Sequence, residues 1–267
     1  MSRGCGWIVD RPDGRDRRVQ ELYGRADTPV LPTGMGASVS LLQHRQGRML
    51  QGSTESCVGF AFSRAVHVNL LARGVSGAEL PAPLFLYYNG RIAEYAGLEP
   101  SEIPPLEDRG SRPRLVMQAA RSHGYCKATD DPFDASLVNK RPPLRCYRRA
   151  VDQADLAFYR VSETGTARVE AVVRALRRGA GVLFGMRVDE AFLAHQGSEP
   201  VRGIGEQTAG RHMMTVLEHR LGAVTVDNWW RDWGFDDGLG RIGDELFGSD
   251  EVSDVYAIHA ASPYSGG

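Results

Sequence analysis

The sequence predicts an α+β fold with a helical first half and a strand-rich second half. Residues 57–74 carry apolar side chains three and four positions apart, which is the spacing of a buried helix face. Residues 181–188 and 212–218 are shorter apolar runs next to turn-forming residues, which is typical of strands. We therefore expect a helical lobe at about 50–130, a sheet lobe at about 145–260 and a seam between them.

The chain is expected to begin with an extension over residues 1–31, followed by one domain over 32–262. Residues 6–31 are mostly charged or turn-forming, which indicates an irregular segment that lies on a folded body. Residues 51–57 form a polar loop that leads into the helix at 57–74. The same two patterns predict the remaining elements. Helices are expected at 84–95, 114–122 and 167–178, and strands at 158–161, 181–188, 212–218, 223–228 and 255–259, with a short segment at 38–42.

The composition is that of a globular chain without a strong charge preference. Of its 267 residues, 42% are apolar, which is enough to bury a sizeable core. The net charge is −1 and the pI is about 6.7, so no global positive field draws the chain to nucleic acid or to an anionic membrane. We expect a soluble monomer. Two clusters of arginine are interpreted as solvated faces, at Arg15, Arg17 and Arg18 and at Arg145, Arg148 and Arg149.

Export signals, membrane spans and metal-ligand patterns do not occur in the sequence. The first residues lack the apolar core of a Sec signal, and no run approaches about 18 apolar residues. We therefore expect a cytoplasmic protein, or one exported by a route without a Sec signal peptide. No two histidines stand at a metal-ligand spacing and no phosphate-binding glycine loop occurs, so neither metal nor cofactor is expected. Reduced thiols are favoured by the wide spacing of the cysteines, although their even number permits disulfides; they are Cys5, Cys57, Cys126 and Cys146.

Cys57 is the first candidate for chemistry because it opens the buried helix. A helix N-terminus and an adjacent protonated imidazole both stabilise a thiolate, which is the nucleophilic form of cysteine. Gly52 and Ser56 let the preceding loop approach a substrate carbonyl, and the amide of Gln51 could donate to an oxyanion. By itself, however, a cysteine at this position is more often a small buried residue.

His212 and Asn228 are the candidates for a base and its partner. His212 enters a strand after a turn that contains glycine, and Asn228 ends the next strand. An imidazole base needs a polar partner on its second nitrogen to fix its tautomer, and an asparagine amide can serve. Trp230 could shield that hydrogen bond from water. Each of these residues alone would more often be structural.

Together these segments resemble the papain-like cysteine peptidases. Residues 51–60, 210–216 and 228–238 are similar to the three signature blocks of that family, in the same order. The separation of Cys57 and His212 is slightly longer than the roughly 130–150 residues that are usual. The resemblance covers nearly the whole chain. It extends to residues 6–16, which are similar to the short leader of bacterial members, and to residues 83–91, 108–111 and 179–192.

The resemblance implies a fold, a reaction and a set of roles. The fold is two-lobed, with a helical left lobe, an antiparallel β-barrel-like right lobe and an active-site cleft between them. The reaction is hydrolysis of a peptide or protein substrate through a thioester. Cys57 is the implied nucleophile, His212 its base and later acid, Asn228 the orienter of His212, and Gln51 an oxyanion donor together with the Cys57 backbone. Substrate-binding positions also follow: Gly110 and Ser111 align the peptide backbone, and Trp230 covers the Asn–His bond.

Several cleft positions depart from the family pattern. Glu55 and Arg211 add charge beside the nucleophile and the base, where the family usually has glycine, and we expect them to form an ion pair across the cleft mouth. Met213 replaces a small residue that lines the main specificity pocket. It should narrow that pocket and favour small or aliphatic residues at the second position before the scissile bond. Trp229 stands where a serine is usual.

Two questions stay open at the level of the sequence. The extension is either a packed part of the domain or a short autoinhibitory segment across the cleft. The protein is either an active endopeptidase, a catalytically weak or inactive papain-fold protein that binds a peptide or protein partner, or a different Cys-His acyl-transfer enzyme. The last of these would not explain Gln51 or the Asn228-Trp-Trp run.

Overall fold

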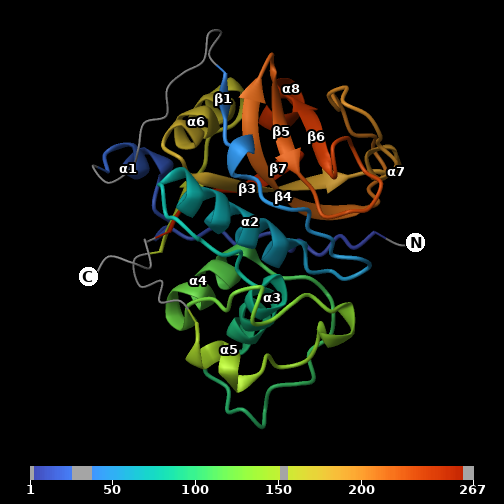
Figure 1. The fold of residues 1–267 in the computed structure, drawn as a ribbon. Helices are drawn as coiled ribbons and strands as arrows, with labels where there is room; N and C mark the ends of the chain where they lie inside the picture. The colour runs from blue at the N-terminus through green and yellow to red at the C-terminus, as the bar shows by residue number, and fades with distance from the viewer. Residues whose placement is uncertain (1–2, 26–37, 151–155, 261–267) are drawn as a thin grey trace.

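The computed structural model describes residues 3–25, 38–150 and 156–260. They form two lobes with helix α2 (Cys57–Ala72) between them, and the first residues of the chain run along the seam below this helix (Figure 1). The lobes coincide with the expected helical and strand-rich halves. The expected boundary between residues 31 and 32 lies outside the described residues.

The helical lobe packs α2 against two further helices. Proline occupies the first position of both, where its missing N–H costs no hydrogen bond. Helix α2 approaches its neighbour closely at Gly59, where an added Cβ would lie 2.4 Å from the Pro83 carbonyl oxygen. The other helices of this lobe are α3 (Pro83–Ile92), α4 (Pro113–His123), α5 (Leu144–Arg148) and the 3₁₀ turns η2 (Ala93–Tyr95) and η3 (Ala135–Leu137).

The second lobe is built on a seven-stranded antiparallel sheet with the order β2-β7-β3-β4-β5-β6, to which β1 is added beside β4. The strands are β1 (Val39–Ser40), β2 (Ala157–Val161), β3 (Gly181–Val188), β4 (Gly210–Arg220), β5 (Ala223–Asp227), β6 (Leu239–Gly243) and β7 (Val252–His259). The helical elements of this half are α6 (Gly165–Arg177), α7 (Glu190–Leu193) and α8 (Asp244–Gly248), and the 3₁₀ turn η1 (Leu42–His44) follows β1.

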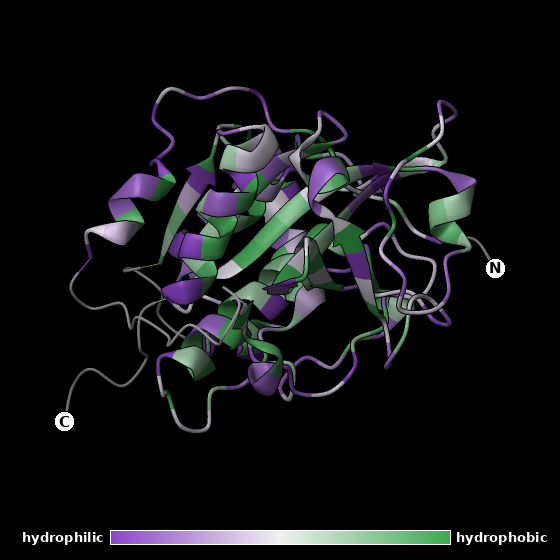
Figure 2. Cartoon of the chain, turned by 90° about the horizontal axis from the view of Figure 1, so that it is seen from above, coloured by the Kyte–Doolittle hydropathy of each residue, from purple (hydrophilic) through white to green (hydrophobic). Residues whose placement is uncertain are grey.

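Two large apolar clusters hold the lobes together. One lies between the sheet and α6, and the other joins α2 to α4 and to the inner face of β3, β4 and β7. Figure 2 shows the hydrophobic colour concentrated on the strands and helix faces that meet in the middle of the molecule. A buried ion pair between Arg64 of α2 and Asp227 of β5, 2.7 Å long, ties the two lobes directly. Because both charges are buried, loss of Asp227 would leave the Arg64 charge uncompensated, whereas Asp227 also pairs with Arg45 at 3.0 Å.

The extension departs from the expected irregular segment because it contains helix α1 (Val19–Tyr23). Val19 and Leu22 are fully buried in the cluster beneath α6, and the Tyr23 hydroxyl donates to the Ala171 carbonyl. Two apolar residues are too few to produce a recognisable helical pattern in a charged stretch. Strand β6 and the short helices were also not predicted. In the described parts of the chain, no helix is long and apolar enough to span a membrane.

Candidate active site

Cys57 is the first residue of α2, at the end of a loop held in a defined shape. The backbone N–H of Gln51 donates to the Trp229 carbonyl at 3.0 Å, and the Thr54 hydroxyl donates back to the Gln51 carbonyl at 2.8 Å. Gly52 has a φ of +59°, a left-handed conformation that suits glycine. These contacts hold the loop that leads into Cys57 in a defined shape.

His212 and Asn228 come from adjacent strands and are joined by a hydrogen bond. His212 lies on β4 and Asn228 directly follows β5, which pairs with β4. The His212 Nε2 and the Asn228 Oδ1 are 2.8 Å apart, and the same oxygen accepts the Trp229 backbone N–H at 2.7 Å. Because the amide oxygen can only accept, Nε2 carries a hydrogen in this arrangement. The Nδ1 atom has no hydrogen-bond partner and keeps a free lone pair.

Two tryptophans support this pair in different ways. The Trp230 ring stacks on the His212 imidazole with 3.9 Å between centroids and an angle of 27°. The Trp229 ring turns inward, where its Nε1 donates to the Met213 carbonyl at 2.9 Å and its ring packs near Phe60. Trp230 therefore covers the imidazole, and Trp229 belongs to the core.

The four side chains named from the sequence are closed off from solvent. Cys57, His212, Asn228 and Gln51 are all 0% exposed. Burial raises the pKa of the Cys57 thiol, which outweighs the opposite effect of the Met213 and Gly6 backbone amides. Burial likewise lowers the pKa of His212 to about 3, although the bond to Asn228 favours its charged form. Both groups are therefore neutral near pH 7 in this closed state.

The closure is made by residues 4–8, here called the cleft segment. The Gly4 carbonyl oxygen accepts from Gln51 Nε2 at 3.2 Å and from Trp230 Nε1 at 3.1 Å, and it also lies close enough to His212 to act on its pKa. The Gly6 backbone amide likewise acts on the Cys57 thiol. The segment thus lies against the nucleophile, the base and the oxyanion donor at once.

Both walls of the cleft pair with the backbone of the cleft segment. On the helical side, Ser111 N–H donates to the Gly6 carbonyl at 2.9 Å and its carbonyl accepts the Ile8 N–H at 3.0 Å. On the sheet side, the Arg211 carbonyl accepts the Trp7 N–H at 3.2 Å. These are bridges of the parallel type, so a peptide strand lies between the two lobes.

Glycine is required where the segment passes through the narrowest part of the cleft. A Cβ on Gly4 would lie 1.9 Å from the Thr54 carbonyl oxygen, and one on Gly6 would lie 1.8 Å from the Glu55 carbonyl oxygen. Gly110, at φ +91°, lies under Gly6, and a Cβ there would be 2.1 Å from the Gly6 carbonyl oxygen. Gly110 therefore makes room for the strand, whereas its neighbour Ser111 provides the backbone hydrogen bonds.

The expected Glu55–Arg211 ion pair is wrong. The two residues lie on opposite sides of Gly6, but within the described residues no ion pair joins them. The Glu55 carboxylate instead accepts the Cys5 backbone N–H at 2.7 Å. The cleft segment thus supplies the partner that the sequence assigned to Arg211.

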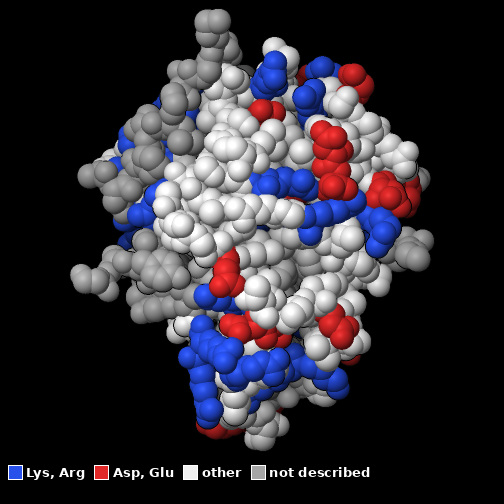
Figure 3. Space-filling model, in the orientation of Figure 1, with Lys and Arg blue, Asp and Glu red and all other residues white. Residues whose placement is uncertain are grey.

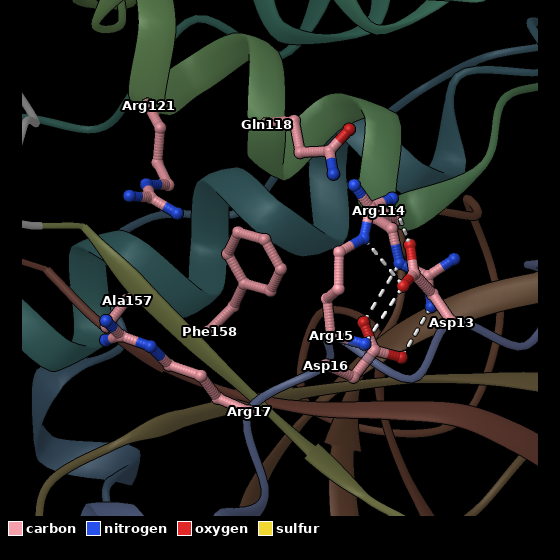
Figure 4. Close-up of a pocket in the computed structure, with 9 residues that line it drawn as sticks. All are labelled: Asp13, Arg15, Asp16, Arg17, Arg114, Gln118, Arg121, Ala157 and Phe158. Carbon is pink, nitrogen blue, oxygen red and sulfur yellow. Dashed lines mark hydrogen bonds and ion pairs between the residues drawn. The ribbon is translucent and has the colours of Figure 1, made fainter.

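Residues 10–23, here called the anchor segment, fasten the extension to the body of the protein. Asp16 binds the Arg114 guanidinium through both carboxylate oxygens, at 3.0 and 2.5 Å (Figure 4). Asp10 accepts the Arg114 backbone N–H at 3.1 Å and the Tyr256 hydroxyl at 2.8 Å. Asp254 of β7 accepts a hydrogen bond from the Asp10 N–H at 2.7 Å and forms an ion pair with Arg160 at 3.1 Å. Burial and the neighbouring Asp254 raise the pKa of Asp10 to about 6.

Charge elsewhere on the surface is mixed. Figure 3 shows lysine and arginine gathered over the tip of the helical lobe, with acidic residues beside them. Arg145, Arg148 and Arg149 are exposed there, and Arg149 pairs with Asp130. No cluster of three metal-ligating side chains occurs in the described ranges.

Sequence reasoning missed the residues of the extension that touch the site. Gly4, Gly6 and Trp7 stand in a Gly-Cys-Gly-Trp run whose small residues were a usable signal for close backbone approach. It also missed that the Trp230 indole N–H donates to the cleft segment, and that Asp254 is a buried carboxylate which binds this segment. Asp254 is 247 positions from Trp7, so no local pattern connects them.

Comparison with known proteins finds cysteine peptidases that are similar to this chain in sequence or in fold. No family model matches the sequence. A peptidase C1-like protein of Acanthamoeba polyphaga mimivirus is 24% identical over 259 residues, which cover 88% of this chain and 79% of the relative. Xylellain, a cysteine protease from Xylella fastidiosa, has a TM-score of 0.76 and 19% identity over 97% of both chains. Procathepsin B from Trypanosoma congolense has a TM-score of 0.68 and 13% identity over 97% of this chain and 87% of its own.

The observed architecture agrees with these relationships. A helical lobe and an antiparallel sheet lobe meet at the N-terminus of α2, and the segments that resemble signature blocks lie together at that seam. The chain has the fold of the papain-like cysteine peptidases.

Proposed function

We propose that this protein is a cysteine-type endopeptidase that hydrolyses peptide bonds through Cys57, His212 and Asn228. The observation that carries the proposal is that the cleft already holds a peptide strand. Its backbone pairs with Ser111 and Arg211, and one of its carbonyls accepts the Gln51 side-chain N–H. A seam that binds peptide backbone beside a thiol and an oriented imidazole fits acyl transfer from peptides.

In the proposed reaction His212 moves one proton through its Nδ1 atom. The Cys57 thiol proton passes to Nδ1, and the sulfur attacks the scissile carbonyl carbon to give a tetrahedral intermediate. When the C–N bond breaks, the same proton passes to the leaving amine and a thioester remains. A water molecule then gives a proton to His212, its oxygen attacks the thioester, and the thiol leaves with that proton. Asn228 keeps the ring oriented because it holds Nε2 at 2.8 Å.

Gln51 and the Cys57 backbone N–H are the proposed oxyanion donors. The Gln51 amide already donates to a peptide carbonyl, that of Gly4, and its position is fixed by a second bond to the Thr54 carbonyl at 2.6 Å. A donor that is preorganised in this way stabilises negative charge without reorientation during the reaction.

The closed state is proposed to be a latent form. This supports the autoinhibitory interpretation of the extension over that of a passive packed segment. In the N-to-C direction the strand passes from Gly4, beside the oxyanion donor, to Trp7, on the wall where the residues before a scissile bond are expected to bind. A substrate would run in the reverse direction, from that wall toward the oxyanion donor. The segment therefore does not present its own peptide bond for attack.

Binding of a peptide without turnover is the second candidate. It is favoured by the complete burial of the four catalytic side chains and by the neutral state of both Cys57 and His212. Under this alternative, opening of the cleft admits a peptide or protein partner that is never cleaved.

Active-site labelling separates the two candidates. We would treat the full-length chain and its Gly6→Val variant, whose cleft segment cannot seat, with iodoacetamide and with a peptidyl epoxide, and map the modified residue by mass spectrometry. A peptidase should be labelled at Cys57, slowly in the parent and faster in Gly6→Val, with labelling lost in Cys57→Ala and reduced in His212→Ala. Cleavage of a casein or peptide-library substrate by Gly6→Val, absent in the Gly6→Val, Cys57→Ser double variant, completes the test. If Cys57 were labelled to the same extent in His212→Ala as in the parent, and no substrate were cleaved, the peptide-binding alternative would be favoured.

A further inference from the structure

The most informative side chain of the cleft segment is Trp7. Its backbone N–H bonds to the cleft wall at Arg211, and its indole is only 5% exposed. The ring lies flat against Gly185 of β3, where an added Cβ would be 2.2 Å from the indole. Gly185 thereby creates a side-chain pocket at the bottom of the cleft, and Trp7 fills it.

The pocket ends in a buried carboxylate. The Trp7 Nε1 donates to the Asp254 Oδ2 at 2.9 Å, and Asp254 is 2% exposed. Asp254 sits where the pairing of β3 and β7 shifts register between Leu183 and Gly185, and its φ is +48°. A bulge that holds a non-glycine residue in a left-handed conformation turns a side chain away from its regular direction at a conformational cost. Here it directs Asp254 to the indole.

The partners of Asp254 divide between the extension and the body. Oδ2 receives Trp7 Nε1 and the Asp10 backbone N–H, both from the extension, whereas Oδ1 is bound by Arg160 of β2. When the cleft segment leaves and the anchor segment stays, Oδ2 loses the Trp7 donor, while the Asp10 N–H and the Arg160 pair remain. Loss of one hydrogen bond to a buried carboxylate is costly, so the empty pocket favours a ligand that supplies an N–H there.

We propose that Asp254 makes this pocket select a tryptophan side chain of the substrate. An indole fits the slot over Gly185 and supplies the donor that Oδ2 lacks. A substrate arginine fits less well because Arg160 already neutralises Asp254 and Arg114 lies nearby. A phenylalanine fills the slot but does not replace the hydrogen bond that Oδ2 loses with Trp7. The proposal rests on the proposed peptidase function.

The proposal replaces the expectation that Met213 restricts the pocket to small or aliphatic residues. Met213 pairs with Gly185 across β3 and β4, so both residues project to the same face, and it belongs to the same apolar cluster as Trp7. Met213 therefore borders a pocket that accommodates an indole.

The test uses the full-length chain with Gly6→Val and Trp7→Ala, which unseat the cleft segment and empty the pocket. Fluorogenic peptides would differ only at the residue that enters the pocket: tryptophan, 1-methyltryptophan, phenylalanine, leucine or arginine. 1-Methyltryptophan keeps the ring but has no N–H. We expect kcat/KM for tryptophan to exceed that for 1-methyltryptophan by about tenfold, because one buried hydrogen bond is lost. The difference should lie mainly in KM.

A variant of the carboxylate assigns the effect to Asp254. Asp254→Gly, which suits the left-handed backbone, should reduce the ratio of tryptophan to 1-methyltryptophan to about one, while Asp250→Ala, an exposed acid four residues earlier, should leave it unchanged. Equal kcat/KM values for the tryptophan and 1-methyltryptophan peptides in the opened chain would overturn the proposal. A preference for arginine or leucine would do the same, whatever the Asp254 variant shows.

Binding is measured separately so that the two proposals can fail independently. Fluorescein-labelled peptides of the same series would be titrated by anisotropy into the opened chain carrying Cys57→Ser. Tighter binding of tryptophan without any turnover in the Cys57 parent rejects the peptidase and keeps the pocket. Turnover without a tryptophan preference rejects the pocket and keeps the peptidase. Failure of every peptide to bind and to be cleaved rejects both.

Discussion

The cleft segment and the anchor segment are consecutive parts of one extension, yet they are held by different forces. Residues 4–8 are held by backbone hydrogen bonds and by the close fit of glycines, and most of their partners are the residues proposed to bind substrate. Residues 10–23 are held by charged side chains and by the apolar residues of α1, whose partners have no proposed catalytic role. Blocking and fastening are therefore separable functions of the extension.

This difference shows how the cleft could open without loss of the extension. A peptide that binds the cleft competes only for the contacts of residues 4–8, because it offers the same backbone groups. The anchor segment offers no such competition, and it keeps the displaced strand near the cleft at a high effective concentration. The following expectations test this division, from the largest effect to the smallest.

Gly6→Val should open the cleft most strongly. A Cβ at this position would lie 1.8 Å from the Glu55 carbonyl oxygen, so the strand cannot keep its path. Overpacking of this kind typically costs about 1–3 kcal/mol, which corresponds to a rate of Cys57 alkylation increased by roughly 5- to 150-fold. The measurement is the rate of iodoacetamide incorporation at Cys57 at fixed pH.

Gly14→Val is the matched control for that variant. Gly14 belongs to the same extension, but an added Cβ has no atom within 4 Å. Its alkylation rate should equal that of the parent. If both variants raised the alkylation rate of Cys57 equally, any substitution in the extension would open the cleft. The separate blocking role of residues 4–8 would then be abandoned.

Arg114→Gln should weaken the anchor segment and affect the cleft less. Arg114 binds both oxygens of Asp16 and the Arg11 carbonyl, at a site that is 10% exposed. Loss of this largely buried charge leaves Arg160, at 3.3 Å, as the one ion-pair partner of Asp16 among the described residues. We expect residues 10–23 to become accessible to trypsin while Cys57 alkylation rises by less than about tenfold.

Arg121→Gln provides the comparison for Arg114. Arg121 is exposed on the same helix and lines the same pocket (Figure 4), but its side chain forms no ion pair among the described residues. Trypsin sensitivity within residues 10–23 should not change in this variant. If Arg114→Gln opened the cleft as much as Gly6→Val, the two parts of the extension would have to act as one unit.

The contrast between the two segments also explains what the sequence could and could not predict. Cys57, His212, Asn228 and Gln51 stand in segments with recognisable local features. In the structure His212 is bonded to Asn228, and the cleft segment lies against Cys57, His212 and Gln51. The strands and long helices were predictable because their apolar spacing is regular over many residues. The path of the extension was not, since its fit depends on single atoms of Thr54 and Glu55 that are distant in the sequence.

The failed ion pair has the same physical origin. Glu55 and Arg211 were paired because they are opposite charges on two walls of one cleft. A third element, the backbone of Cys5, supplies a donor at 2.7 Å and takes the Glu55 carboxylate. Charge alone cannot reveal such a competitor, because every backbone N–H in the chain is an equally good candidate.

Acid should weaken the cleft segment through His212. Burial holds its pKa at about 3, against an ordinary value of 6.5. A lowered histidine pKa means that the open or unfolded state binds the proton first, so closure is at full strength above about pH 6.5 and is lost as pH falls toward 3. Between pH 7 and 5.5 the expected loss is roughly 1 kcal/mol. The free energy of urea unfolding of the full-length chain, measured at both pH values, gives this change.

His212→Gln separates this effect from that of the anchor segment. Asp10 has a raised pKa, about 6, so it titrates in the opposite sense: its contribution to stability is present at low pH and is lost as pH rises from about 4 to 6. The variant keeps Asp10 and removes only the imidazole, and its loss of stability between pH 7 and 5.5 should be smaller than that of the parent by roughly 1 kcal/mol. An identical pH dependence in both chains would mean that His212 takes up no proton on opening. The pH response would then be assigned to the charged groups around residues 10–23.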